Sequence, residues 1–155
     1  MPPFEIESLQ SLKQWEGYEF PATDWFTVKQ DRIETFSDAT EDHQWIHVDP
    51  ERTARESPFG GCIAQGFLTL SLLSHFLKQA LRIRSGVTVT INYGLNKVRF
   101  PSAVRAGSAV RARASLLSVR EAAEFVDATF LIHVEGQSSE KPCCVAEWLV
   151  RYYRE

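Results

Sequence analysis

The sequence predicts an α+β fold in which an antiparallel sheet wraps around one long central helix, and two observations predict it. Residues 65–81 carry apolar side chains on nearly all sides, which is typical of a helix buried inside a domain. Four strand-like runs follow this segment without a further helix. Because a helix that is apolar all round must be covered, we expect the sheet to curl around it.

The central helix is expected over Gln65 to Leu81. Its buried surface consists of large apolar side chains, namely Phe67, Leu68, Leu70, Leu72, Leu73, Phe76 and Leu77. Its far end turns polar at His75, Lys78, Gln79 and Arg82. We therefore expect that end to emerge into water.

The four strands are expected at 87–100, 108–119, 124–134 and 145–153. These runs are rich in β-branched and aromatic residues, and the second alternates apolar with polar residues. Turn residues follow two of them, at Pro101 and at Gly136. One buried helix followed by a run of antiparallel strands is the layout of the hotdog fold.

The part of the chain before the helix has weaker patterns. Residues 1–15 have apolar residues at helical spacing, and residues 18–28 read as a first strand interrupted by Pro21. Thr27 and Gln30 fit a capping box.

That capping box predicts a short helix that ends near Thr40, with an apolar face formed by Ile33, Phe36 and Ala39. Residues 41–61 then lack any sustained period and contain two prolines and a Gly-Gly turn. We expect a long, mostly irregular excursion there, and such loops are usually functional.

Composition bounds the class of protein. The chain has 155 residues, so we expect one domain over residues 1–155. A net charge of -3 argues against a nucleic-acid or anionic-membrane binder. Three cysteines, two of them adjacent, give no disulfide framework, and there is neither a signal-peptide pattern nor a run of 18 apolar residues. These features favour a cytoplasmic protein without a membrane span.

Asp42 and His47 are the principal catalytic candidates. On a continuous helix they would point about 140° apart, so they can act on one ligand only if the chain bends between them. An imidazole can take a proton from water and return it, and a neighbouring carboxylate can orient that water. The alternative is that Asp42 caps a turn while His47 packs with satisfied hydrogen bonds.

The surrounding motifs favour the catalytic interpretation, because the chain resembles the MaoC-like dehydratase and (R)-specific enoyl-CoA hydratase family, in particular its nodulation-protein-N-type branch. Asp42 to Pro50 reads D-H-Q-W-I-H-V-D-P, and Phe59 to Leu73 reads F-G-G-C-I-A-Q-G-F-L-T-L-S-L-L. The segments N-Y-G-L-N-K-V-R-F-P, from Asn92 to Pro101, and A-E-W-L-V-R-Y-Y are also similar to this family. The resemblance covers about residues 30–154.

The resemblance implies roles for particular residues. Asp42 and His47 match the water-activating pair, and Gly66 matches the glycine whose backbone N–H polarises the thioester carbonyl. Ser74 falls where related hydratases carry a polar residue near the site; alternatively its hydroxyl bonds back to a helix carbonyl. Lys97 and Arg99 share one strand face and could reach a CoA phosphate, or could be exposed strand charges.

Three residues depart from the family pattern. Gln44 replaces the usual Asn and keeps an amide, and Gln65 replaces the His before the helix glycine. Trp45 replaces Pro and either reshapes the pocket wall or packs as a core aromatic. These departures bear on the substrate range more than on the reaction.

The expected function is reversible addition of water to a 2-enoyl thioester, giving by resemblance the (R)-3-hydroxyacyl product. The resemblance also implies a homodimer and a CoA or acyl-carrier-protein thioester as substrate, with no cofactor. No metal-ligand spacing is present in the sequence. Two alternatives are a hotdog thioesterase, which directs water at the thioester carbonyl carbon, and a non-catalytic acyl-thioester-binding module.

Overall fold

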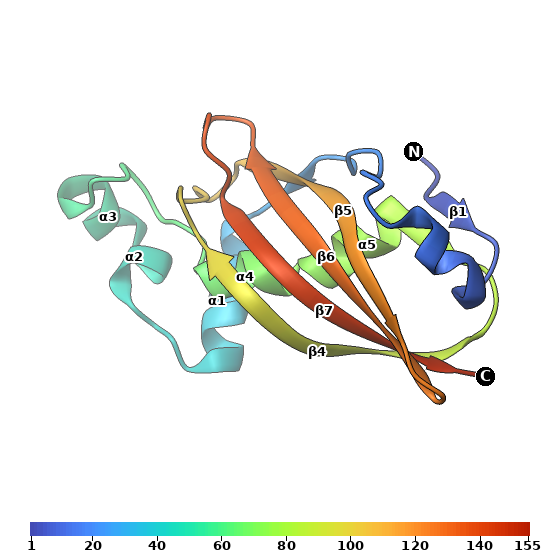
Figure 1. Ribbon diagram of the computed structural model, residues 1–155. Helices are drawn as coiled ribbons and strands as arrows, with labels where there is room; N and C mark the ends of the chain where they lie inside the picture. Colours follow the sequence, from blue (N-terminus) through green and yellow to red (C-terminus); the bar gives the residue numbers. More distant parts are fainter.

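The computed structural model describes all 155 residues and shows a curled antiparallel sheet whose inner face is covered by helices α4 (Gly66–Ser71) and α5 (Leu73–Ala80) (Figure 1). The sheet has the strand order β2-β5-β6-β7-β4. Its strands are β2 (Phe26–Thr27), β4 (Val87–Arg99), β5 (Ala109–Glu121), β6 (Phe125–Gly136) and β7 (Cys144–Arg154). The predicted sheet around a helix is confirmed, and its four long strands begin and end within two residues of the predicted limits.

The core lies between the sheet and the helices. Leu116, Phe130 and Trp148 are paired in register across β5, β6 and β7, so their side chains form one row on the inner face. The row belongs to the same buried cluster as Leu73 and Phe76 of α5. This burial of large apolar side chains is the main source of the fold's stability.

The central helix differs from the prediction in two ways. It is two helices that meet at Leu72, and it stops at Ala80, because Leu81 begins strand β3 (Leu81–Ile83), which pairs in parallel with β1 (Phe4–Ile6). Phe67 is also 70% exposed. The helix is therefore not covered on all sides, and its first turns have an open face.

Two N-terminal predictions are correct only in part. Residues 1–15 form β1 and then a 3₁₀ helix, η1 (Leu9–Trp15), because Ile6 pairs with the edge of β3 and Ser8 caps the helix that follows. In residues 18–28 only β2 is a strand. The rest touches β5 through scattered backbone hydrogen bonds and a single bridge, since Pro21 has no N–H to donate.

The helix expected before the irregular segment is present as α1 (Gln30–Thr40), but the capping box is wrong. Its N-cap is Lys29, and no side chain caps it. On its inner face Ser37 is buried, whereas Ala39 is exposed. The predicted apolar face is thus correct only in part, because a polar residue takes the second buried position.

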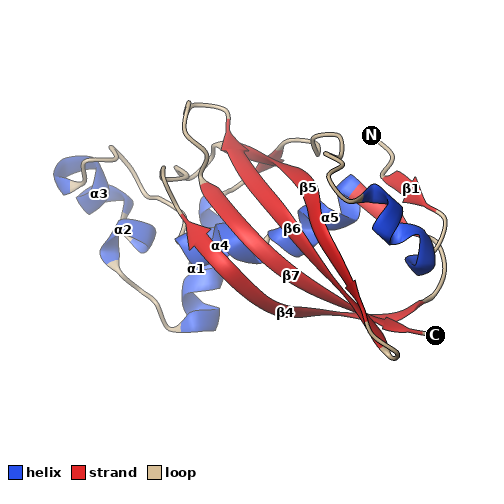
Figure 2. Ribbon diagram, viewed as in Figure 1, coloured by secondary structure: helices blue, strands red, loops and turns tan.

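Residues 41–61 are more regular than predicted. They contain α2 (Trp45–Val48) and α3 (Pro50–Glu56), and the Asp49 carboxylate caps α3 by accepting from the Arg52 amide at 3.0 Å. Both helices extend to the left beyond the end of β4 (Figure 2). We call residues 41–61 the arm. None of the protein's helices has the length and hydropathy needed to cross a membrane.

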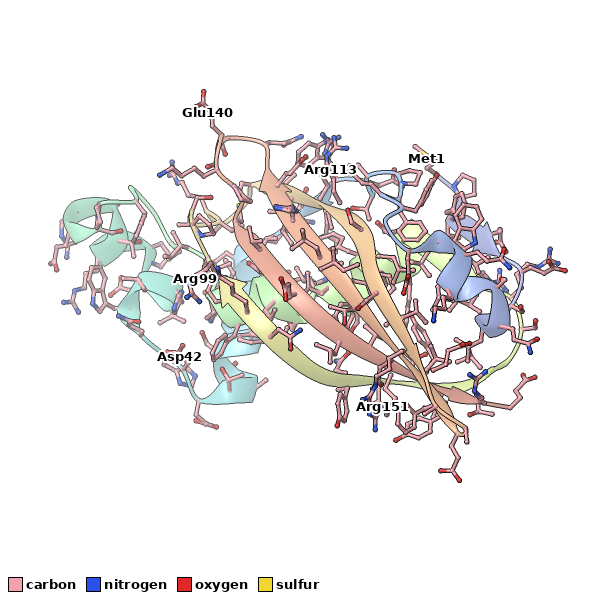
Figure 3. All side chains as sticks on the ribbon, in the orientation of Figure 1. Met1, Asp42, Arg99, Arg113, Glu140 and Arg151 are labelled. Atoms are coloured by element: carbon pink, nitrogen blue, oxygen red, sulfur yellow. The ribbon has the colours of Figure 1, made fainter.

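An ion pair between Arg151 and Asp127 lies on the outer face of the sheet, near the C-terminal end of β7. Arg151 donates two hydrogen bonds to Asp127, at 2.7 and 2.9 Å, and its guanidinium lies 3.7 Å from the Tyr93 ring centroid and 3.6 Å from that of Phe125 (Figure 3). Hydrogen bonding to Arg151 holds the pKa of the Asp127 carboxyl below its ordinary value.

A carboxyl whose pKa is lowered by folding adds stability above its unfolded pKa of about 3.9, and this contribution is lost as the pH falls through the folded value. We predict that Asp127→Ala lowers the melting temperature by several degrees at pH 7 and that the difference from wild type shrinks below about pH 4. Arg120→Ala is the control. Arg120 is 77% exposed and lies 3.6 Å from the same carboxylate, so its loss should have little effect at either pH. Equal effects of the two variants would contradict the prediction.

Candidate active site

The chain bends between Asp42 and His47, as a shared site requires. Helix α1 ends at Thr40, and Glu41 adopts the left-handed conformation with φ 60° just before Asp42. Between Asp42 and His47 the backbone is not helical at Gln44, with φ -56° and ψ 136°. The Asp42 carboxylate accepts a 3.4 Å hydrogen bond from the backbone N–H of Gln44, just before α2 begins. Asp42 and Gln44 are both exposed, and Asp42 makes no hydrogen bond to His47.

His47 is held in one orientation. It is buried, with 6% of its surface exposed, and its Nδ1 lies 2.7 Å from the carbonyl oxygen of Ile63. Because a carbonyl can only accept, Nδ1 carries the proton of the neutral ring. Nε2 is then the unprotonated nitrogen, and no protein group bonds to it. His47 is thus arranged as a base.

The same contact brings the arm to the start of α4. The Ile63 amide donates to the Ile46 carbonyl at 3.1 Å, so two hydrogen bonds join α2 to the segment that leads into Gly66. The amides of Gly66 and Phe67 lie in the first turn of α4 and donate to no protein group. Such amides, together with the helix dipole, favour developing negative charge.

Gly66 is packed against an aromatic ring. A Cβ built on it would lie 3.1 Å from two carbons of the Phe100 ring, which is tighter than ordinary contact. Phe100 itself is 38% exposed and therefore has room to shift. A side chain at this position would therefore displace the Phe100 ring, and the absence of one leaves the Gly66 backbone open to close approach.

Two glutamines, Gln30 and Gln65, hold α2 and the start of α4 in place, and the sequence analysis did not predict these roles. The Gln30 Nε2 donates to the His47 carbonyl at 2.7 Å. The Gln65 Nε2 donates to the Ser37 hydroxyl at 2.7 Å and to the Ile33 carbonyl at 3.2 Å, which ties the residue before Gly66 to α1. For Gln65, the only signal in the sequence was that it replaces the histidine of the family pattern. For Gln30, the predicted capping box assigned the side chain to the start of α1, whereas it bonds to His47.

Ser74 faces the space between α5 and β4. Its hydroxyl lies 3.5 Å from the Asn92 Oδ1, to which it donates, and not against a helix carbonyl. The alternative in which it bonds back to the helix is therefore wrong. Trp45 is half-buried on the arm, where the Arg52 guanidinium stacks 4.2 Å from its ring centroid, and it lies outside the core cluster.

Lys97 and Arg99 are not brought to this site. Both are exposed on β4, and Val98 between them points inward against the core. Their side chains therefore project from the opposite face of the sheet to α4. Arg99 Nη1 donates to the carbonyl of Val98, and Figure 3 shows this residue near the same end of the molecule as Asp42.

Sequence comparison places the chain among named relatives. Residues 13–136 match the family described as MaoC like domain. The 3-hydroxyacyl-thioester dehydratase Z of Mycobacterium tuberculosis H37Rv is 50% identical over 148 residues, which cover 95% of this chain and 97% of that protein. Nodulation protein N of Rhizobium leguminosarum bv. viciae is 44% identical over 143 residues, covering 92% and 89%.

Solved structures share the fold at lower identity. A MaoC-like dehydratase from Rhodospirillum rubrum has a TM-score of 0.75 at 23% identity and covers 97% of this chain and 99% of that one. The (R)-hydratase from A. caviae involved in PHA biosynthesis has a TM-score of 0.68 at 23% identity, covering 87% and 94%. A chain of the HadBC (3R-hydroxyacyl-ACP dehydratase) complex of Mycobacterium tuberculosis has a TM-score of 0.66 at 15% identity, covering 90% and 96%. These likenesses establish the hotdog fold.

Proposed function

The chain belongs to the MaoC-like domain family, and we infer that it is a hydro-lyase that interconverts 3-hydroxyacyl thioesters and 2-enoyl thioesters. The observation that carries this inference is the fixed His47 ring. Its hydrogen bond to the Ile63 carbonyl leaves Nε2 without a protein partner, and Ile63 lies three residues before Gly66, the first residue of α4. A base beside an anion-stabilising helix end is what hydration of an enoyl thioester needs.

In the hydration direction, His47 Nε2 takes a proton from a water molecule that the Asp42 carboxylate orients. The water oxygen forms a bond to C3, the C2–C3 double bond opens, and electron density moves onto the thioester oxygen. The protonated His47 ring returns this proton to C2 as the enolate reverts to the thioester, so the elements of one water molecule are added across C2 and C3. The Asp42 side chain is exposed and makes no direct hydrogen bond to His47, so in this proposal the two residues act together through the water molecule.

Gly66 is proposed to supply the N–H that stabilises the enolate-like oxygen. Its amide belongs to the first turn of α4, where the helix dipole adds to the attraction for negative charge. Gln44, next to the turn, could contact the thioester from the exposed side.

The proposed substrate is a CoA or acyl-carrier-protein thioester with the (R) configuration at C3. The outward direction of Lys97 and Arg99 gives no support to a direct role for them at the reacting carbons, although they could contact the far end of a CoA. The cysteine thiols form no disulfide, which favours a reducing compartment such as the cytoplasm.

One assay tests the proposed reaction against its rivals. The protein is incubated with crotonyl-CoA while enoyl absorbance and free thiol are both followed. We expect loss of the enoyl signal without thiol release. Thiol release would indicate a thioesterase, and no change in either signal, also with longer enoyl thioesters, would indicate a binding module.

We predict that Asp42→Ala and His47→Ala each lower the hydration rate by about 10²–10⁴-fold, because each removes one member of an acid/base pair. Since the two act on one water, the double variant should be little worse than the worse single variant. His43→Ala is the matched control, because His43 is exposed beside Asp42 and pairs only with Asp38. Turnover close to wild type in either single variant would remove that residue from the mechanism.

We predict that Gly66→Ala lowers turnover by about 10²–10³-fold, because the added Cβ lengthens the amide contact to the developing oxyanion. The Phe100 ring complicates this variant, so it is compared with Gly66→Ala/Phe100→Leu, in which the ring contact is relieved. Steady-state kinetics and a thermal melt are measured for both. Recovery of activity in the double variant would show that Gly66 serves packing and that the oxyanion donor lies elsewhere.

We further propose that the protein is a homodimer joined along β4. This strand is 13 residues long and lies at an edge of the sheet, so one row of its backbone groups is unpaired. Its large apolar residues are also 43–55% exposed, at Val89, Ile91, Tyr93 and Leu95. A long apolar edge strand is an aggregation hazard unless a partner covers it.

Light scattering at micromolar concentration should therefore give twice the chain mass. Ile91→Glu should shift the population toward monomer, because it places a charge in the proposed interface. Leu117→Glu is the control, since Leu117 is also 43% exposed but lies on β5, which β6 and β7 separate from β4. A monomeric wild-type protein would contradict the proposal.

A further inference from the structure

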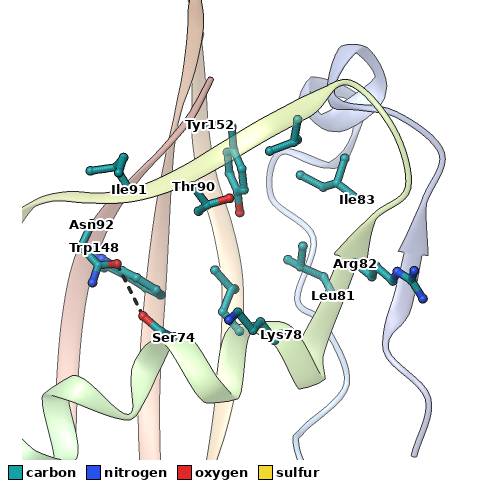
Figure 4. A pocket seen from close by; sticks show the side chains of 12 residues that line it. Ser74, Lys78, Leu81, Arg82, Ile83, Thr90, Ile91, Asn92, Trp148 and Tyr152 are labelled. Atoms are coloured by element: carbon teal, nitrogen blue, oxygen red, sulfur yellow. Dashed lines mark hydrogen bonds between the residues drawn. The ribbon is translucent and has the colours of Figure 1, made fainter. Parts of the chain in front are cut away.

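A cavity lies between the first turn of α4 and residues 100–104, which leave the end of β4. It has a volume of about 370 Å³, and Gly66 is among its lining residues, so it begins at the proposed oxyanion site. Two exposed aromatic residues, Phe59 and Phe100, also line it. The cavity between α5 and β4 that Figure 4 shows has none of these lining residues, so the two cavities are separate.

One wall of the cavity beside Gly66 presents unpaired peptide groups. The Val104 carbonyl accepts from the Ala64 amide at 2.7 Å, which holds this wall against the segment that enters α4. Just before it, Ser102 and Ala103 line the cavity, and their peptide groups form no hydrogen bond with another protein group. Because backbone N–H and C=O groups pair wherever they can, this wall favours a ligand that has amides of its own.

Arg105 places a positive charge beside the same cavity. Its Nη2 donates to the Gly60 carbonyl at 3.1 Å, and a Cβ built on Gly61 would lie 3.1 Å from this nitrogen. The guanidinium therefore lies against the turn that follows Phe59. Unlike most arginines of this chain, Arg105 forms no ion pair with a carboxylate, and its side chain is exposed. Its charge is thus available to an anionic ligand.

We propose that this cavity holds the pantetheine chain of the substrate and that Arg105 binds the phosphate at the end of that chain. The proposal rests on the proposed hydro-lyase function, because it starts from a thioester carbonyl at Gly66. A pantetheine chain has two amides between apolar methylene and methyl groups, and a guanidinium binds its terminal phosphate through paired N–H groups. An acyl chain has no group that could pair with the Ser102 and Ala103 backbone or with Arg105.

The length of the pantetheine chain agrees with this placement. Gly61, which the Arg105 guanidinium contacts, is five residues before Gly66, so their Cα atoms lie at most about 18 Å apart. An extended pantetheine chain has about thirteen bonds from sulfur to phosphorus and spans roughly 16 Å, given single bonds of about 1.5 Å. CoA and acyl carrier proteins both carry this phosphorylated chain, so the site would recognise what the two kinds of substrate share.

The experiment uses crotonyl thioesters that have the same reacting group and differ only in the carrier. The carriers are N-acetylcysteamine, pantetheine, phosphopantetheine and CoA. For the wild type, kcat/KM should rise at least about tenfold from N-acetylcysteamine to pantetheine, because more apolar groups enter the cavity. It should rise again on the order of tenfold from pantetheine to phosphopantetheine, because the phosphate pairs with Arg105.

Arg105→Gln should remove most of the second rise while changing kcat/KM for the pantetheine thioester by less than about twofold. Arg120→Gln is the matched control, since it removes the same charge from a 77% exposed side chain at the opposite end of β5. It should leave all four efficiencies unchanged. Arg99→Gln tests the neighbouring exposed arginine, and removal of the second rise by that variant alone would overturn the assignment to Arg105.

Equal efficiencies of the wild type with N-acetylcysteamine and pantetheine thioesters would overturn the placement of the chain in this cavity. An equal loss on all four thioesters in Arg105→Gln would show that the bond to Gly60 only supports the fold of the arm, and would overturn the phosphate site. A loss confined to crotonyl-CoA would place Arg105 at the nucleotide and overturn it as well. Failure of the wild type to hydrate any of the four thioesters would instead contradict the proposed function itself.

Discussion

The hydrogen bond between the His47 ring and the Ile63 carbonyl is the interaction on which the arrangement of the site depends. It joins residues sixteen positions apart, attaches the arm to the segment that enters α4, and determines which ring nitrogen is free. Gln30 supports it from α1 by bonding the His47 carbonyl. Together with the Ile63 amide, which donates to the Ile46 carbonyl at 3.1 Å, this contact fixes the imidazole relative to the start of α4.

Several exposed elements surround the candidate site. Asp42 is exposed, the first turn of α4 is open at Phe67, and β4 beside them is an edge strand with exposed apolar residues. In a monomer these are unfavourable exposures. The proposed dimer would cover the exposed edge of β4, and the proposed thioester substrate would enter beside that edge and cover Phe67. Substrate access and the proposed dimer contact therefore involve the same region of the surface.

The parts of the fold that could be predicted are those with local periodicity. The four long strands and the apolar helix each carry their pattern within about a dozen residues, and their limits came close to the observed ones. The break at Leu72, the exposed Phe67 and the two helices of the arm were missed. These features depend on the residues that pack against each segment, or on a capping residue such as Asp49. The spacing of apolar residues along the sequence contains no information about such contacts.

For the site, the sequence by itself determined which reactive groups are present: Asp42 and His47 flanking a polar turn, and a glycine at the start of an apolar helix. Tertiary structure decided how they are placed. It selected the protonated nitrogen of His47 through Ile63, placed Gln65 against Ser37, and turned Lys97 and Arg99 away from α4. The reason is physical. A residue type specifies what a side chain can donate or accept, but its partner is set by the path of the whole chain, and these partners are far apart in sequence.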